Sequence, residues 1–229
     1  MRIKICGITQ PAQGQAIAQL GATALGFICV PQSPRYVSFE QMGAVVDQLP
    51  RTAAGQPTVD RVGVFVNAAI ADIVSGVAIA QLSAVQLHGH ESPQFCRQLR
   101  EAMPTLEIIK AFRIKNSETL QQIEAYAGLI DALLVDAFHP QATHPGLYGG
   151  TGKTLDWISL RQFRPFCPWL LAGGITPDNV LDALGQVQPD GIDVSSGVEL
   201  APGNKDLAKV GQLLAQLQTL RETTAAVSL

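Results

Sequence analysis

A lysine and a cysteine stand two positions apart near the start of the chain, within residues 3–9. This stretch predicts a short strand followed by a turn into a helix. Because side chains alternate along a strand, Lys4 and Cys6 share one face and Ile3 and Ile5 share the other. A neighbouring cation favours the thiolate, which is the reactive form of cysteine. Cys6 is therefore a candidate catalytic base, and the alternative is a buried cysteine that packs as a small apolar side chain.

A carboxyl group closes an apolar run later in the chain. Asp136 follows Ala132–Val135, a run that is typical of a buried strand. Burial disfavours the charged form of a carboxyl group, so Asp136 is a candidate general acid at neutral pH. The alternative is a surface aspartate that caps the next loop.

Two turns have the composition of an anion-binding site. Gly173 and Gly174 allow a ligand to approach the backbone closely, and Ser195-Ser196-Gly197 offers backbone and hydroxyl donors. Together they favour phosphate binding, although either turn alone is also compatible with ordinary turn chemistry.

Three further polar side chains are candidates for contacts with a ligand. Arg35 lies in the proline-containing loop 31–36 and is either a clamp for a carboxylate or a solvated surface arginine. His88 is expected to form a hydrogen bond in the wall of the site. With His90 it offers two ligands where a zinc site needs at least three, so no metal is expected. Asp193 is expected to pair with Lys4, in a role that is as well explained by structure as by catalysis.

The stretch from Ala137 to Gly152 is the least regular part of the chain and is rich in Gly, His and Pro. It predicts a long loop of the kind that closes over active sites.

Gly152-Lys153-Thr154 has the sequence that ends a Walker loop, but position 147 is Leu where that motif requires Gly, which excludes a nucleoside triphosphatase. Lys153 is expected to help neutralise an anion.

Eight short runs rich in β-branched residues alternate with helical patterns along the chain. The predicted strands are Ile3–Cys6, Ala24–Val30, Arg61–Val66, Ala84–Leu87, Ile108–Phe112, Ala132–Asp136, Trp169–Ala172 and Gly191–Val194. Eight such units favour a single α/β domain over residues 1–229, a (β/α)8 or TIM barrel, since parallel strands need crossover helices. The alternative is a doubly wound open sheet, which carries a glycine fingerprint after its first strand that this chain lacks.

Several helix starts carry recognisable signals. Ser38 begins a capping box, and Ser92-Pro93 and Thr176-Pro177 each place a cap residue before a first-turn proline. The last helix is predicted from an apolar stripe that begins at Leu207, and 223–229 is expected to be a frayed tail. In a barrel the carboxyl ends of all strands meet at one end. The candidate residues are therefore expected to converge there, with phosphate at the loops after strands 7 and 8.

Composition narrows the class of protein further. The net charge is −3, 47% of the residues are hydrophobic and 15% are charged, which favours a compact globule. The absence of a basic run argues against nucleic acid as a partner. The weakly charged run Ala68–Ala80 is too short to span a bilayer, and the first residues lack the apolar core of a signal peptide. The four cysteines have no C-x-x-C spacing, which favours a reducing cytoplasm.

Seven motifs, spread in order along nearly the whole chain, resemble those of the phosphoribosylanthranilate isomerase family. They are Lys4-Ile5-Cys6-Gly7-Ile8-Thr9, Ser33-Pro34-Arg35-Tyr36, Gly63-Val64-Phe65-Val66-Asn67, Val85-Gln86-Leu87-His88-Gly89, Gly149-Gly150-Thr151-Gly152-Lys153-Thr154, Leu171-Ala172-Gly173-Gly174-Ile175 and Asp193-Val194-Ser195-Ser196-Gly197-Val198-Glu199. The resemblance implies the cofactor-free Amadori rearrangement of N-(5-phosphoribosyl)anthranilate to 1-(2-carboxyphenylamino)-1-deoxyribulose 5-phosphate in tryptophan synthesis.

The resemblance also implies roles for individual residues. Carried over by position, Cys6 is the general base that removes the C2′ proton, and Asp136 is the general acid that opens the furanose. Arg35 holds the anthranilate carboxylate, and the loops 173–174 and 195–197 hold the phosphate. The stretch Ala137–Leu147 is longer than expected for the family, which bears on lid closure and substrate access.

Three other classes of protein match this sequence less well than the phosphoribosylanthranilate isomerase family. A histidine-pathway isomerase runs the same rearrangement in a similar barrel, but is expected to carry Asp in place of Cys6. A lyase or synthase needs a catalytic lysine at a mid-chain strand end, where Lys110 is a candidate in surroundings that do not match. A binding module without activity predicts the loss of Cys6 or Asp136. The expected partner is a phosphosugar, and the chain is expected to be a monomer or a homodimer.

Overall fold

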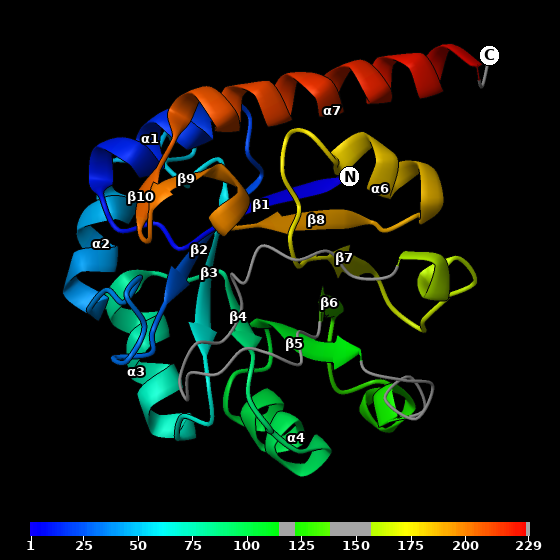
Figure 1. Cartoon of the computed structure of the whole chain (residues 1–229). Coiled ribbons are helices and arrows are strands. Elements are labelled where there is room, and N and C mark those ends of the chain that lie inside the picture. Colours follow the sequence, from blue (N-terminus) through cyan, green and yellow to red (C-terminus); the bar gives the residue numbers. More distant parts are fainter. Residues whose placement is uncertain (115–121, 138–156, 228–229) are drawn as a thin grey trace.

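Eight parallel strands close into a barrel in the computed structural model of this chain, with β1 to β8 following one another in chain order (Figure 1). The structure describes residues 1–114, 122–137 and 157–227. Pairing of β1 with β8, from Arg2 beside Gly191 to Ile5 beside Val194, completes the ring. The prediction of a (β/α)8 barrel is therefore confirmed, and an open sheet is excluded.

The strands of the barrel are short and most of their side chains are buried. They are β1 Arg2–Cys6, β2 Ala24–Ile28, β3 Asp60–Phe65, β4 Ala84–Leu87, β5 Glu107–Ile114, β6 Ala132–Ala137, β7 Trp169–Leu171 and β8 Gly191–Val194. The bounds of β4 and β8 agree with the prediction. The largest difference is in β5, which extends to Ile114 because it pairs with β6 as far as Ala137.

Helices surround the barrel (Figure 1). They are α1 Pro11–Gln19, α2 Phe39–Asp47, α3 Ile70–Ala80, α4 Pro93–Ala102, α6 Val180–Gln186 and α7 Leu207–Val227, with 3-10 helices η1 Glu124–Tyr126, η2 Trp157–Leu160 and η3 Ser196–Val198. A two-stranded antiparallel hairpin follows β8 and is made of β9 Glu199–Ala201 and β10 Asn204–Lys205. Within the described residues, none of the helices is long and apolar enough to cross a membrane.

Two of the predicted helix starts are confirmed. The Ser38 hydroxyl accepts from the backbone N–H of Gln41, whose side chain accepts in return from the Ser38 N–H, and this forms a capping box. Ser92 caps α4 before Pro93.

The predicted start at Thr176-Pro177 is wrong, since α6 begins at Val180. The Asn179 side chain accepts from the Thr176 N–H and donates to the Gly174 carbonyl, at 2.8 and 2.9 Å. Both bonds hold this segment as a turn, and the helix begins only after it.

Side chains alternate between the two faces of the strands as expected. Ile3 and Ile5 belong to the large apolar core between strands and helices, whereas Lys4 points into the barrel, where it meets Asp193. The barrel interior is filled by small and branched apolar side chains: Ala24, Val62, Ala84, Ile109, Ala111, Ala132, Leu134, Leu170 and Ala172. Because side chains alternate along each strand, the polar side chains that point into the barrel lie at the two ends of this apolar interior.

The apolar stripe of α7 is confirmed over most of its length. Val210, Leu213, Leu214 and Leu217 are buried, and Leu207 at the helix start is 39% exposed. The helix extends to Val227. The extent of the single domain and the fraying of 223–229 remain predictions.

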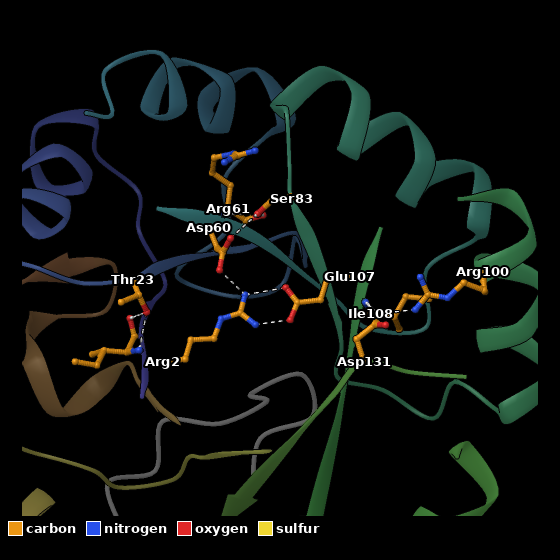
Figure 2. A network of polar contacts seen from close by, with 10 residues as sticks. Arg2, Thr23, Asp60, Arg61, Ser83, Arg100, Glu107, Ile108 and Asp131 are labelled. Carbon is orange, nitrogen blue, oxygen red and sulfur yellow. Dashed lines mark hydrogen bonds and ion pairs between the residues drawn. The ribbon is translucent and has the colours of Figure 1, made fainter. Parts of the chain in front are cut away.

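The amino end of the barrel is closed by charged side chains that start three alternate strands (Figure 2). Arg2 Nη2 donates to Asp60 Oδ2 and to Glu107 Oε2, each at 2.9 Å, and Arg2 Nη1 also donates to Glu107. These contacts tie β1 to β3 and β5 across the barrel. The carboxyl end is therefore the open end, where ligands bind in barrels of this kind.

Candidate active site

One pocket at the carboxyl end of the barrel gathers ten residues that were proposed from the sequence as catalytic or ligand-binding. The empty space in it, together with the solvent that opens onto it, is ≈ 840 Å³. The predicted residues in its lining are Cys6, Arg35, His88, Asp136, Gly173, Gly174, Asp193, Ser195, Ser196 and Gly197. Residues up to 191 positions apart in sequence thus meet because each lies near the end of a strand of the same barrel or follows it.

Cys6 lies at the end of β1, close to two charged side chains. Lys4 is fully buried, and its Nζ lies 2.9 Å from Asp193 Oδ1, as predicted. Burial alone lowers the pKa of Lys4, but Asp193 and Cys6 outweigh this effect and raise it, so Lys4 is a cation. Burial raises the pKa of the Cys6 thiol, which Lys4 opposes. The expected net preference for thiolate is therefore not found: burial has the larger effect on this thiol.

Asp136 ends the buried run of β6 and faces a histidine across the pocket. His88 Nε2 lies 3.4 Å from Asp136 Oδ2. The Gln86 side-chain amide nitrogen lies 2.8 Å from His88 Nδ1. With the amide placed this way, its nitrogen faces Nδ1, which leaves Nε2 as the ring nitrogen on the Asp136 side. Gln86 was not singled out from the sequence, although it shares a strand face with His88.

The two glycine-containing turns lie side by side at the pocket. Gly173 and Gly174 have φ of 90° and 68°, a left-handed backbone that other residues rarely adopt. A Cβ on Gly197 would lie 1.9 Å from the Ile175 carbonyl oxygen, so only glycine allows the loop after β8 to approach the loop after β7. Asn179 braces the first turn through its bond to Gly174.

The guanidinium of Arg35 is buried at the pocket and is already paired. Its Nε and Nη2 donate to the Glu199 carboxylate at 2.9 and 2.7 Å. Lys205 Nζ lies 2.7 Å from the same carboxylate. Burial raises the pKa of Glu199, but the bonds from Arg35 and Lys205 outweigh it and hold that pKa below its ordinary value.

Glu199 and Lys205 were missed from the sequence as partners of the site. Glu199 closes the last family-like motif, which was the one available signal, while Lys205 lies in a hairpin that no pattern marked. The predicted lid from Ala137 to Gly152 lies outside the described residues from position 138 onward, and so does Lys153. In the described ranges, no group of three or more His, Cys, Asp or Glu side chains is placed to hold a metal ion.

The fold and the pocket define a (β/α)8-barrel protein with a polar site at the carboxyl end of its strands. A family model described as N-(5′phosphoribosyl)anthranilate (PRA) isomerase matches residues 3–216. The chain therefore belongs to the phosphoribosylanthranilate isomerase family, as the sequence motifs suggested.

Individual relatives agree with this assignment. An N-(5′-phosphoribosyl)anthranilate isomerase from Rippkaea orientalis is 59% identical over 95% of this chain and 96% of its own. A crystal structure of phosphoribosyl anthranilate isomerase in complex with reduced 1-(o-carboxyphenylamino)-1-deoxyribulose 5-phosphate is 34% identical, with a TM-score of 0.80 over 96% of this chain and 99% of that one. A structure of monomers generated from the dimeric isomerase of Thermotoga maritima is 33% identical, with the same TM-score and coverage.

Proposed function

We propose that this chain catalyses the Amadori rearrangement of N-(5′-phosphoribosyl)anthranilate to 1-(2-carboxyphenylamino)-1-deoxyribulose 5-phosphate by general acid–base catalysis. The observation that carries the proposal is the meeting of a thiol, a carboxyl group and two glycine-containing turns in one pocket of an isomerase-family barrel. The reaction moves protons within one substrate and leaves its electron count unchanged, so side chains suffice for it.

The two anionic ends of the substrate determine how it lies in the pocket. The turns at 173–174 and 195–197 suit the phosphate, because they combine backbone N–H groups, hydroxyls and space close to the chain. Arg35 suits the anthranilate carboxylate through paired hydrogen bonds. With both ends held, the ribose lies between the β1 side and the β6 side of the barrel mouth.

Asp136 acts first, as the general acid. It gives a proton to the furanose ring oxygen while the bond from C1′ to that oxygen breaks, and the bonding pair stays on the oxygen. The anilino nitrogen supplies its lone pair to C1′ and forms the protonated Schiff base. His88, whose Nε2 lies 3.4 Å from Asp136 Oδ2, stabilises the carboxylate that this step leaves behind.

Cys6 acts second, as the general base. Burial makes the thiolate the less stable form of Cys6, and Lys4 opposes that effect. The thiolate takes the C2′ proton, the C–H pair becomes the second bond between C1′ and C2′, and the C=N pair returns to nitrogen. The resulting enol amine loses its O2′ proton and gains one at C1′, which yields the ketone. Lys4 stabilises the thiolate, while Asp193 holds Lys4 in place. Each of the two groups is expected to contribute on the order of 10²–10⁴ in rate.

The proposal also includes the compartment in which the enzyme works and its oligomeric state. All four cysteines are unpaired, which suits a reducing cytoplasm. Of the two oligomeric states expected from the sequence, a homodimer has a precedent in the dimeric Thermotoga maritima isomerase.

The test is turnover of freshly generated N-(5′-phosphoribosyl)anthranilate, followed as loss of its fluorescence without added metal or nucleotide. The wild-type protein is expected to consume it far above the spontaneous rate, and Cys6→Ala and Asp136→Asn to lower kcat by about 10²–10⁴. Cys167→Ala is the control, because this thiol is also unpaired but is not part of the pocket lining. Consumption at the spontaneous rate would refute the proposal, and the cognate histidine intermediate would then test the related isomerase.

A further inference from the structure

The Arg35 guanidinium has two edges that can each bind a carboxylate, and only one of them is occupied. Glu199 takes the edge formed by Nε and Nη2. In the part of the chain that the structure describes, no other acceptor pairs with this side chain. The second edge, formed by Nη1 and the other Nη2 proton, is therefore open to the pocket that Arg35 lines. Glu199 and a substrate carboxylate can bind Arg35 at the same time.

Charge decides whether a second carboxylate is attracted. Arg35 and Glu199 alone form a neutral pair, which offers little to an incoming anion. Lys205 changes this balance, since its ammonium is 1% exposed and lies 2.7 Å from Glu199 Oε1. Two cations and one carboxylate leave a net charge of +1, which matches one carboxylate. The surplus charge acts in a buried site, where screening is weak.

The position of Lys205 is held by contacts on several sides. Its Nζ donates to the Ser195 carbonyl at 3.3 Å, and its backbone N–H donates to Gln13 Oε1 at 3.0 Å. The hairpin that carries it is tied to the β1–α1 loop by the Thr9 hydroxyl, which donates to the Gly203 carbonyl at 2.5 Å. The same ammonium therefore contacts the Arg35–Glu199 pair and the loop assigned to phosphate.

We propose that Lys205 and Glu199 are positioning residues that make the Arg35 subsite specific for one carboxylate: Glu199 fixes the open edge of Arg35 toward the pocket, and Lys205 supplies the surplus positive charge. The inference rests on the proposed function, since it concerns the carboxylate of that substrate. Neither residue touches the reacting atoms.

The test compares two probes that differ by one carboxyl group. One is reduced 1-(o-carboxyphenylamino)-1-deoxyribulose 5-phosphate, and the other is its anilino counterpart without the carboxyl group. Lys205→Met is expected to reduce the affinity ratio of the two probes on the order of tenfold, because the cluster becomes neutral. Fluorescence titration measures both dissociation constants. The double variant Lys205→Met/Glu199→Gln restores a charge of +1 and is expected to recover most of the ratio.

A matched control exists in another buried lysine. Lys110 is 2% exposed and its Nζ lies 3.0 Å from Glu91 Oε2, so Lys110→Met also removes a buried ammonium from beside a buried carboxylate. It is expected to leave the affinity ratio unchanged. If Lys205→Met does not fold, Glu199→Gln carries the test, because its amide oxygen can still accept from Arg35 while the cluster charge rises to +2. The affinity ratio is then expected to rise above the wild-type value, and an unchanged ratio overturns the charge assignment.

The outcomes separate the two proposals. Equal weakening of both probes by Lys205→Met, or a double variant that lacks the wild-type ratio, overturns the charge assignment alone. A wild-type protein that binds neither probe overturns the proposed function together with it.

Discussion

Gly26 in β2 lies against the side chain proposed as the base, and a single methyl group there tests how tightly that base is placed. A Cβ at position 26 would lie 2.6 Å from Cys6 Sγ, 2.9 Å from Lys4 Nζ and 3.0 Å from Cys6 Cα. The first distance is about 0.8 Å below ordinary van der Waals contact. Rotation of the Cys6 side chain moves Sγ away from the new methyl group, but the 3.0 Å contact with Cys6 Cα belongs to the backbone and stays tight. Gly26→Ala therefore displaces Cys6 and Lys4 together.

Two effects on stability oppose each other in this variant. Replacing a strand glycine lowers the entropy of the unfolded chain and stabilises by about 0.4–1 kcal/mol. Overpacking inside the barrel costs about 1–3 kcal/mol, so a net loss is expected, with a fall in Tm of several degrees at most. Catalysis is more sensitive, because a displacement near 1 Å costs on the order of 10² in rate. We expect kcat to fall about a hundredfold in a folded protein.

The assay pairs fluorescence-detected turnover with thermal unfolding of the same sample. Gly63→Ala is the matched control, since its Cβ would lie 2.6 Å from Leu82 Cδ1 and 2.8 Å from Phe65 Cε2, on the helix-facing side of β3. It is expected to lower Tm comparably and to leave kcat near the wild-type value. A folded Gly26→Ala protein whose kcat falls by less than about tenfold would refute the claim that the backbone confines Cys6.

Further predictions concern the thiols and the phosphate loop. Cys6 is proposed to act as thiolate, and Lys4 opposes the burial that raises the pKa of this thiol. In Lys4→Met the acidic limb of the pH profile of kcat/KM is therefore expected to move to higher pH, and an unmoved limb contradicts this. In Gly197→Ala the Cβ meets the Ile175 carbonyl at 1.9 Å, so competitive inhibition by inorganic phosphate should weaken by about tenfold or more, and an unchanged inhibition constant excludes phosphate there. Burial raises the pKa of Cys29 to about 12, so mass spectrometry should find it unmodified by iodoacetamide at pH 7; rapid modification would show that this burial is wrong.

The convergence of the site could be predicted because it follows from strand order. Once eight β-then-α units were recognised, Cys6, Asp136 and the turn at Ser195 had to meet at the carboxyl end of the barrel. The pairing of Lys4 with Asp193 followed from the adjacency of β1 and β8 alone. These inferences depend only on the alternation of side chains along each strand and on the order of the strands in the barrel. They do not require the conformation of any loop.

Other features depend on contacts that pattern does not encode. Lys205 reaches Glu199 through the register of a hairpin, and neither composition nor period marks that hairpin. The late start of α6 depends on two bonds made by the Asn179 side chain. The pKa of Cys6 depends on the balance between burial of the thiol, which raises it, and Lys4, which lowers it. The sequence indicated the lysine beside the thiol but not how deeply the thiol is buried.

The pairing of Lys4 with Asp193 has a consequence for biosynthesis of the protein. The two residues are separated by 189 positions, so a nascent chain exposes a strand with an unmatched ammonium until nearly all of it has left the ribosome. Lys4 of β1 can be buried without a large desolvation penalty only after β8 has brought Asp193 beside it. Closure of the ring is thus coupled to assembly of the surroundings of Cys6, the proposed base. A chain interrupted before residue 193 is expected to lack activity even where its first seven strands have formed.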